Sequence, residues 1–207
     1  VKADGLALGK GVLICKSTRE AEEAVKHTMC DHAFGKSGDR VVIEEFLEGP
    51  EVSVLAFTDG KAMVPMVSSM DHKRAHDGDT GLNTGGMGTI APNPFYTAEV
   101  SERCMREIFL PTMQAMNAEG RTFKGCLYFG LMLTKDGPKV IEYNCRFGDP
   151  ETQVVLPLLD TDLLTIMRAV EEERLSEVDV RFKGGAACCV ILASGGYPEA
   201  YEKGKAI

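Results

Sequence analysis

The sequence predicts an α+β fold built on antiparallel sheets, and three observations support that class. A strand and a helix open the chain, several short strands joined by tight turns follow, and further helices come late. Turn residues such as Thr58-Asp59-Gly60 separate the strands and are typical of hairpins. The strands and helices do not alternate regularly, as they would in a doubly wound parallel sheet.

Hydrophobic periodicity and turn residues place the individual elements. Ser17 to Glu20 has the form of a capping box, and apolar residues at helical spacing follow it. Pro111 is expected to kink or split the helix that contains it. We expect strands at 11–16, 40–47, 51–57, 61–68, 125–134, 139–145 and 185–193, and helices at 19–33, 97–118, 151–159 and 162–173.

Composition restricts the classes of function. The formal net charge is −8, which disfavours a nucleic-acid partner, because a diffuse acidic surface repels phosphates. No apolar run is long enough to span a membrane, and no secretory leader opens the chain. The seven cysteines lack the spacing of a zinc site and indicate reduced thiols in a cytoplasmic protein. Val1 falls within an apparent strand, which suggests a fragment of a longer protein.

A glycine-rich segment with two lysines, Lys2 and Lys10, opens the chain. Glycines let backbone amides approach a phosphate, and a lysine adds a point charge. The segment is not a Walker A loop, because Gly11 follows Lys10 where Ser or Thr is needed. A plain glycine turn explains this segment equally well.

An acidic segment joins the strands predicted around residue 50. It contains Glu44, Glu45, Leu47 and Glu51. A strand-like backbone edge can offer a carbonyl and an N–H to adenine, and a carboxylate can bind ribose hydroxyls. An acidic hairpin without ligand is an equally good interpretation of the segment alone.

Two oxygen donors, Glu142 and Asn144, lie two apart on a predicted strand and therefore share one face. Hard oxygen ligands suit Mg²⁺ or Mn²⁺ carried with a nucleotide. Arg146 follows and can clamp a carboxylate or phosphoryl group. Asp149 and Glu151 place acids at the start of the next helix, which is a sufficient structural role for both. Arg146 and Asp149 are the candidate catalytic residues.

Residues 69–96 hold five glycines and two prolines with almost no apolar periodicity, and we expect a long functional loop. Charges of both signs and clustered glycines suit a small phosphorylated substrate, although a solvated surface loop is the alternative. The candidate binding residues are Asp71, Lys73, Arg74, Gly85, Gly86, Met87 and Gly88.

Taken together, these segments resemble the ATP-grasp superfamily, and within it the phosphoribosylamine–glycine ligase family. The resemblance covers nearly the whole chain in the family's order. It lies in KADGLALGKGV at 2–12, EEFLEGPEVS at 44–53, DHKR at 71–74, NTGGMG at 83–88 and EYNCRFGDPETQ at 142–153. NTGGMG and NCRFGDPETQ are the most specific of these motifs.

The resemblance implies two α+β subdomains that grip ATP between antiparallel sheets. Residues 1–44 would form the lid, 45–181 the main subdomain with the substrate loop and metal site, and 182–207 the start of a truncated C-terminal domain. Lys2 would contact ATP phosphate, the backbone near Glu45 and Leu47 would hold adenine, and Glu51 would hold ribose. Glu142 and Asn144 would bind Mg²⁺ or Mn²⁺.

The implied reaction is ATP-driven formation of an amide between glycine and 5-phosphoribosylamine through glycyl phosphate. Arg146 would bind the glycine carboxylate or its phosphorylated form, and Asp71, Lys73, Arg74 and residues 85–88 would bind phosphoribosylamine. Pro50 and Leu82 depart from the family pattern, and the strand LYFGLML lacks the further acid of many ATP-grasp enzymes. Another ATP-grasp carboxylate–amine ligase and a non-catalytic ATP-binding fragment are the alternative interpretations.

Overall fold

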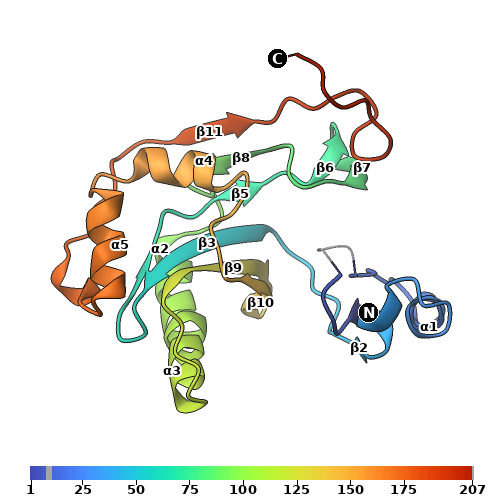
Figure 1. The fold of residues 1–207 in the computed structure, drawn as a ribbon, viewed down its shortest axis with the longest axis horizontal. Helices are drawn as coiled ribbons and strands as arrows, with labels where there is room; N and C mark the ends of the chain where they lie inside the picture. The colour runs from blue at the N-terminus through green and yellow to red at the C-terminus, as the bar shows by residue number, and fades with distance from the viewer. Residues whose placement is uncertain (8–10, 207) are drawn as a thin grey trace. The chain divides into compact units, whose positions relative to one another are not determined.

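The computed structural model describes residues 1–7 and 11–206, and it divides into two compact units, Val1–Glu48 and Gly49–Ile207. The division falls between residues 48 and 49, whereas the sequence places the subdomain boundary between 44 and 45. Figure 1 shows the helices and strands of both units.

The first unit combines one amphipathic helix with a short antiparallel ribbon. β1 (Lys2–Ala3) pairs with β2 (Val41–Val42), and α1 (Thr18–Met29) and a 3-10 turn (Gly35–Gly38) come between them in sequence. Ser17 Oγ accepts from the Glu20 N–H at 3.2 Å, as the capping box predicts. The Glu20 carboxylate reaches back one residue further than predicted, to the Lys16 N–H at 2.7 Å.

The strands predicted at 11–16 and 40–47 are wrong in extent. Val12 forms an isolated bridge with Lys2, and the second segment keeps the two strand residues of β2. Ile14 and Ile43 remain 67% and 71% exposed, so the described part of this unit gives these segments no apolar layer to pack on. The helix predicted at 19–33 ends at Met29, four residues early.

The second unit is built on a four-stranded antiparallel sheet in the order β10-β9-β3-β4. Its strands are β3 (Glu51–Thr58), β4 (Met63–Pro65), β9 (Gly125–Thr134) and β10 (Gly137–Asn144). β9 has the bounds predicted for it, and β3 differs by one residue. Every residue of β3 after Glu51 is buried, because layers of structure cover both faces of this strand.

One face of the sheet is covered by a long helical segment. It consists of α2 (Ala98–Cys104), a π-helical turn (Met105–Phe109) and α3 (Leu110–Ala118). The rings of Phe109 and Phe129 pack with their centroids 4.3 Å apart. The predicted disturbance at Pro111 is confirmed as this π-helical turn just before it, since proline cannot donate to the helical ladder. Among the described helices, none combines the length and apolarity needed to cross a bilayer.

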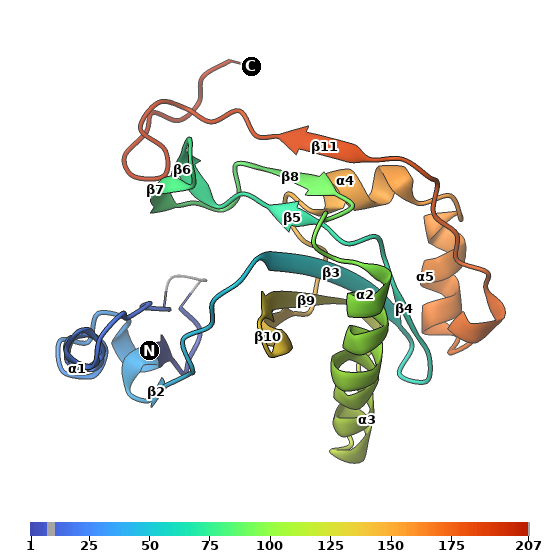
Figure 2. The ribbon, with the colours of Figure 1, turned by 180° about the vertical axis from the view of Figure 1, so that it is seen from behind.

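A second layer covers the other face (Figures 1 and 2). Its sheet has the order β11-β8-β5, from β5 (Met70–Asp71), β8 (Gly88–Ala91) and β11 (Ala187–Val190). Helices α4 (Thr152–Val155) and α5 (Leu163–Glu171) and the 3-10 turns Leu156–Leu158 and Leu175–Glu177 complete the layer. Leu55, Phe57 and Tyr128 meet Val154 and Ile166 in the core between the layers.

The long loop predicted at 69–96 is wrong, because this segment contains four short strands. β5 and β8 join the second sheet, and β6 (Arg74–His76) and β7 (Thr80–Asn83) form a hairpin of their own. β8 pairs with β11, which comes about a hundred residues later, so no local pattern could reveal it.

Candidate functional site

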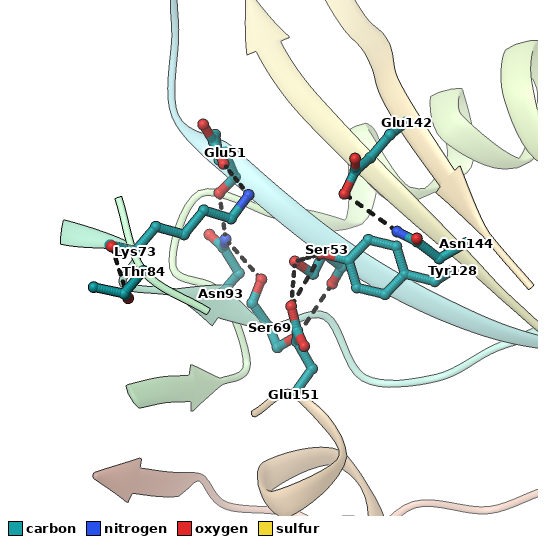
Figure 3. Close-up of polar contacts among 10 residues, drawn as sticks. All are labelled: Glu51, Ser53, Ser69, Lys73, Thr84, Asn93, Tyr128, Glu142, Asn144 and Glu151. Atoms are coloured by element: carbon teal, nitrogen blue, oxygen red, sulfur yellow. Dashed lines mark hydrogen bonds and ion pairs between the residues drawn. The ribbon is translucent and has the colours of Figure 1, made fainter. Parts of the chain in front are cut away.

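The candidate site is a polar region on one face of the main sheet. The register places Ser53 opposite Gly130 and Gly130 opposite Glu142, and it places Tyr128 opposite Asn144. Residues that pair directly or lie two apart share a face, so these side chains all project to the same side. A bulge between Val140 and Glu142 shifts the register of β10. Figure 3 shows the resulting cluster of polar side chains.

Glu142 and Asn144 lie side by side, as the sequence predicts. The Asn144 amide donates to Glu142 Oε1 at 3.2 Å (Figure 3). Tyr143 turns to the opposite face, where its hydroxyl lies 3.1 Å from Thr112 Oγ1. Gly130 leaves space beside the carboxylate, because a Cβ there would lie 3.1 Å from Glu142 Cγ.

This pair fits a divalent cation that arrives with a nucleotide. In the described part of the chain, no three His, Cys, Asp or Glu side chains gather into a metal-binding group. One carboxylate and one amide oxygen suit Mg²⁺, which keeps several waters and is commonly held by one or two carboxylates together with substrate phosphates.

Glu51 and Lys73 form an ion pair at the start of β3, with Oε2 and Nζ 3.1 Å apart. Asn93 fixes the backbone here by donating to the carbonyls of Glu51 and Ser69, at 3.0 and 3.2 Å. Burial lowers the pKa of Lys73, but the carboxylates of Glu51, Asp71 and Glu142 more than offset it, and that pKa is raised. The fold therefore brings the predicted ribose-binding acid and a predicted substrate-binding lysine into direct contact.

Asp71 carries an unusual carboxyl group. Its Oδ1 is buried and lacks a hydrogen-bond partner within the described structure. Gly86 fits closely between it and Pro150, because a Cβ at Gly86 would lie 2.9 Å from Asp71 Oδ1 and 2.5 Å from Pro150 Cδ. Burial, followed by the negative charge of Glu151, raises the pKa of Asp71 to about 7. A carboxyl that changes charge near neutral pH is typical of functional sites.

Arg146 and Asp149 lie on the segment that links β10 to α4. Arg146 Cζ lies 5.9 Å from the centroid of the Tyr128 ring, and its Nη1 donates to the Phe147 carbonyl at 3.0 Å. Asp149 is exposed, and its Oδ1 accepts from Gln153 Nε2 at 2.6 Å. The structure thus brings Arg146 to the polar face of the sheet, whereas Asp149 interacts with its own helical turn.

Glu151 is the residue that the sequence analysis misjudged, because its position before a helix suggested a charge at the helix start. Its side chain makes no capping hydrogen bond and is 3% exposed. Its Oε1 instead accepts from Tyr128 OH at 3.0 Å and Ser53 Oγ at 3.3 Å (Figure 3). Sequence reasoning also missed Ser53 and Tyr128 as site residues, although Ser53 lies within one of the motifs.

The remaining predicted substrate residues belong to the 74–88 segment. Arg74 Nη1 donates to the Gly81 carbonyl at 2.9 Å, within the β6–β7 hairpin. The Gly85 N–H donates to Tyr197 OH at 2.9 Å, and the Met87 N–H donates to the His72 carbonyl at 2.8 Å. Gly88 requires its glycine, because φ is +152° and a Cβ would lie 2.5 Å from the Cys189 carbonyl oxygen.

The other predicted ATP-binding residues belong to the first unit. Lys2 Nζ forms an ion pair with Glu44 Oε1 at 3.0 Å. Glu45 and Leu47 lie on the segment without regular secondary structure that follows β2. Lys10 falls outside the described residues.

A cavity of about 560 Å³ lies on the opposite face of the main sheet, beside the helical segment. Tyr143 lines it, whereas Glu142 and Asn144 project from the other side of the same strand. The other lining residues are Glu107, Ile108, Pro111, Thr112, Ala115, Met116, Phe123, Leu127, Val140 and Cys145. This cavity is therefore separate from the polar face.

The two units and their antiparallel sheets define an ATP-grasp fold. An L-amino acid ligase from Bacillus licheniformis shares the fold with a TM-score of 0.58 at 21% identity, over 90% of this chain and 44% of that one. The family model described as the phosphoribosylglycinamide synthetase ATP-grasp (A) domain matches residues 1–152. The chain belongs to this family.

Curated relatives named phosphoribosylamine–glycine ligase match the chain along its length. The protein from Vibrio vulnificus is 51% identical, over 100% of this chain and 48% of its own length. The protein from Clostridium acetobutylicum is 51% identical, over 99% of this chain and 49% of its own. The crystal structure of phosphoribosylamine–glycine ligase from Thermotoga maritima superposes with a TM-score of 0.82 at 38% identity, over 97% of this chain and 50% of that one. The chain spans about half the length of these relatives.

Proposed function

We propose that the protein containing this chain is an ATP-dependent ligase that joins glycine to 5-phosphoribosylamine. The products would be glycinamide ribonucleotide, ADP and phosphate, as a step of purine biosynthesis. The observation that carries the proposal is the shared polar face, on which Glu142 and Asn144 project together and Arg146 lies beside them on Tyr128. The description of the matched family and the names of the relatives support the choice of these two substrates.

The side chains of this face take the following parts. Glu51 binds the ribose of ATP, and Glu142 and Asn144 hold Mg²⁺ or Mn²⁺. When bound, the cation neutralises charge on the transferring phosphoryl group. Arg146 binds the glycine carboxylate, whose oxygen attacks the γ-phosphorus of ATP, so that ADP leaves and glycyl phosphate forms. In such a transfer the protein supplies positioning and charge stabilisation, and a protein nucleophile is unnecessary.

The second substrate attacks in the next step. The amine of 5-phosphoribosylamine forms a bond to the acyl carbon of glycyl phosphate, phosphate leaves, and the nitrogen loses a proton. We propose that Asp71, Lys73, Arg74 and the glycines near residue 86 bind this substrate. We propose Asp149, which lies on the same segment as Arg146, as the second catalytic residue.

Further assignments complete the proposal. The first unit acts as the lid. Lys2 and Lys10 bind the phosphates of ATP. The segment that contains Glu44, Glu45 and Leu47 binds adenine. Residues 182–207 lead into a further domain. We place the protein in the cytoplasm, which suits the seven free cysteines.

The test is ADP release by the natural full-length protein. Release is expected to require both glycine and 5-phosphoribosylamine, and release that needs neither would contradict the assignment. Glu142→Ala is expected to abolish turnover, since it removes the charged cation ligand. Tyr143→Phe, on the opposite face of the same strand, is the matched control and should retain activity. A screen of other carboxylic acids would identify a different ATP-grasp ligase.

A further inference from the structure

A buried hydrogen-bond network lies on the polar face of the sheet, where Glu151 meets Tyr128 and Ser53. Glu151 is 3% exposed, although glutamate is rarely buried to this extent. Its Oε1 accepts from the hydroxyls of Tyr128 and Ser53, and these two hydroxyls lie 2.7 Å apart. Burying a carboxylate is unfavourable unless hydrogen bonds satisfy it, so a fold that keeps one here uses it to fix its partners.

The ring of Tyr128 is the surface on which Arg146 lies. The guanidinium carbon is 5.9 Å from the ring centroid, within the range of a cation–π contact. Tyr128 is 4% exposed, and its hydroxyl is held at the far end of the ring by Glu151. The ring therefore has a fixed position, while Arg146 itself is exposed and its side chain has no ion pair in the described structure.

Glu151 also fixes the segment that carries Arg146. A Cβ at Gly148 would lie 2.3 Å from Glu151 Oε2, so the backbone here packs directly on the buried carboxylate. Thr152 Oγ1 donates to the Gly148 carbonyl and closes the following turn. The side chain and the backbone of Arg146 are thus both constrained through Glu151.

We propose that Glu151 and Tyr128 are positioning residues: Glu151 fixes the Tyr128 ring, and the ring orients the Arg146 guanidinium toward the carboxylate substrate. This inference rests on the proposed function, because it takes Arg146 as the group that binds the glycine carboxylate. Neither positioning residue needs to touch the substrate.

The experiment measures the KM values for glycine and for ATP in the natural full-length protein. Tyr128→Leu removes the ring and is expected to raise the glycine KM about tenfold while the ATP KM stays within about twofold. Tyr128→Phe keeps the ring and should retain most of the affinity for glycine, so the glycine KM should rise only about threefold. Glu151→Gln keeps the side-chain shape and should also raise the glycine KM about threefold.

Two comparisons separate positioning from general stability. Phe129→Leu changes a fully buried ring on the opposite face of the same strand, and it should leave the ratio of the two KM values unchanged. The double variant Tyr128→Phe with Glu151→Gln should be no worse than either single variant, because both disrupt the same interaction. Circular dichroism checks that each variant is folded. If Tyr128→Leu unfolds, Tyr128→Phe and Glu151→Gln, which conserve the side-chain volume, decide whether the positioning role holds.

The outcomes distinguish this inference from the proposed function. If the wild-type protein releases ADP without a response to glycine, the proposed function is wrong, and this inference fails with it. If the wild type responds to glycine but its glycine KM does not change in the Tyr128 and Glu151 variants, the positioning role alone is overturned. The positioning role alone is also overturned if the KM values for glycine and for ATP rise equally in these variants.

Discussion

Replacing Asp71 by Asn removes a charge that the fold holds in an unfavourable place. Asp71 Oδ1 is buried and has no hydrogen-bond partner within the described structure. Burial and the nearby charge of Glu151 raise the pKa of the carboxyl to about 7. We therefore expect Asp71→Asn to stabilise the second unit at neutral and alkaline pH, while losing a proposed substrate-binding group.

The size of the effect follows from the shift in pKa. The rise from 3.8 to about 7 is roughly three pH units, and each unit corresponds to about 1.4 kcal/mol. The resulting ~4 kcal/mol is an upper limit, because the carboxyl is partly exposed and solvent screens its interactions, which leaves about 1 to 2 kcal/mol. Between pH 4 and 7 the folded state binds more protons at Asp71 than the unfolded state, so wild-type stability falls as pH rises through this window.

The assay is urea unfolding at pH 5 and pH 8. The five tyrosines all lie in the second unit and the chain has no tryptophan, so tyrosine fluorescence reports on that unit. The stability gained by Asp71→Asn should be about 1 kcal/mol larger at pH 8 than at pH 5, because part of the effect is already present at pH 5. Asp77→Asn, at an exposed position in the β6–β7 turn, is the matched control and should show no such difference. An Asp71→Asn gain that is the same at both pH values would refute the reasoning.

Three other changes have defined outcomes. Asp59→Ala should destabilise the second unit by about 2 to 3 kcal/mol in urea unfolding, since its buried carboxylate accepts from three backbone N–H groups. Burial raises the pKa of Asp59 but these hydrogen bonds lower it overall, so its contribution should be present above pH 4 and lost as pH falls further. Gly49→Ala should destabilise the second unit by about 1 to 3 kcal/mol, because φ is +149° and the new Cβ would lie 2.1 Å from the Leu133 carbonyl oxygen. Gly184→Ala is the control and should not change the stability, because a Cβ there meets open space. Glu51→Gln should raise the KM for ATP more than it lowers kcat, since ribose binding is nearly uniform between ground and transition states; an unchanged ATP KM would contradict the ribose assignment.

The main sheet could be predicted from the sequence because its signals are local. β9 is a continuous apolar run that ends at a turn, and its bounds match the prediction. The alternation of Glu142, Tyr143 and Asn144 predicted which side chains share a face, and their contacts confirm it. The capping box at Ser17 was confirmed for the same reason, since its partners lie within a few residues.

The parts that could not be predicted depend on partners far away in the sequence. Glu151 is 98 residues from Ser53 and 23 from Tyr128, so nothing in its neighbourhood reveals that it is buried. β5 and β8 have few residues each, and the pairing of β8 with β11 and of β5 with β8, rather than local periodicity, makes them strands. Ile14 and Ile43 lie in strand-like sequences, but strand propensity needs a packed surface to act on.

The bulge between Val140 and Glu142 determines which way the end of β10 faces. Ile141 is the extra residue, and if β10 paired regularly through it, Ile141 would lie opposite Gly130 and the side chain at 142 would pair with Phe129 and face the helices. Regular pairing through Ile141 would then turn the carboxylate and the amide toward the apolar cavity and bring Tyr143 to the polar side, whereas deleting Ile141 would leave Glu142 opposite Gly130. Substitutions that leave this bulge in place should therefore be tolerated far better than changes that draw Ile141 into the regular ladder.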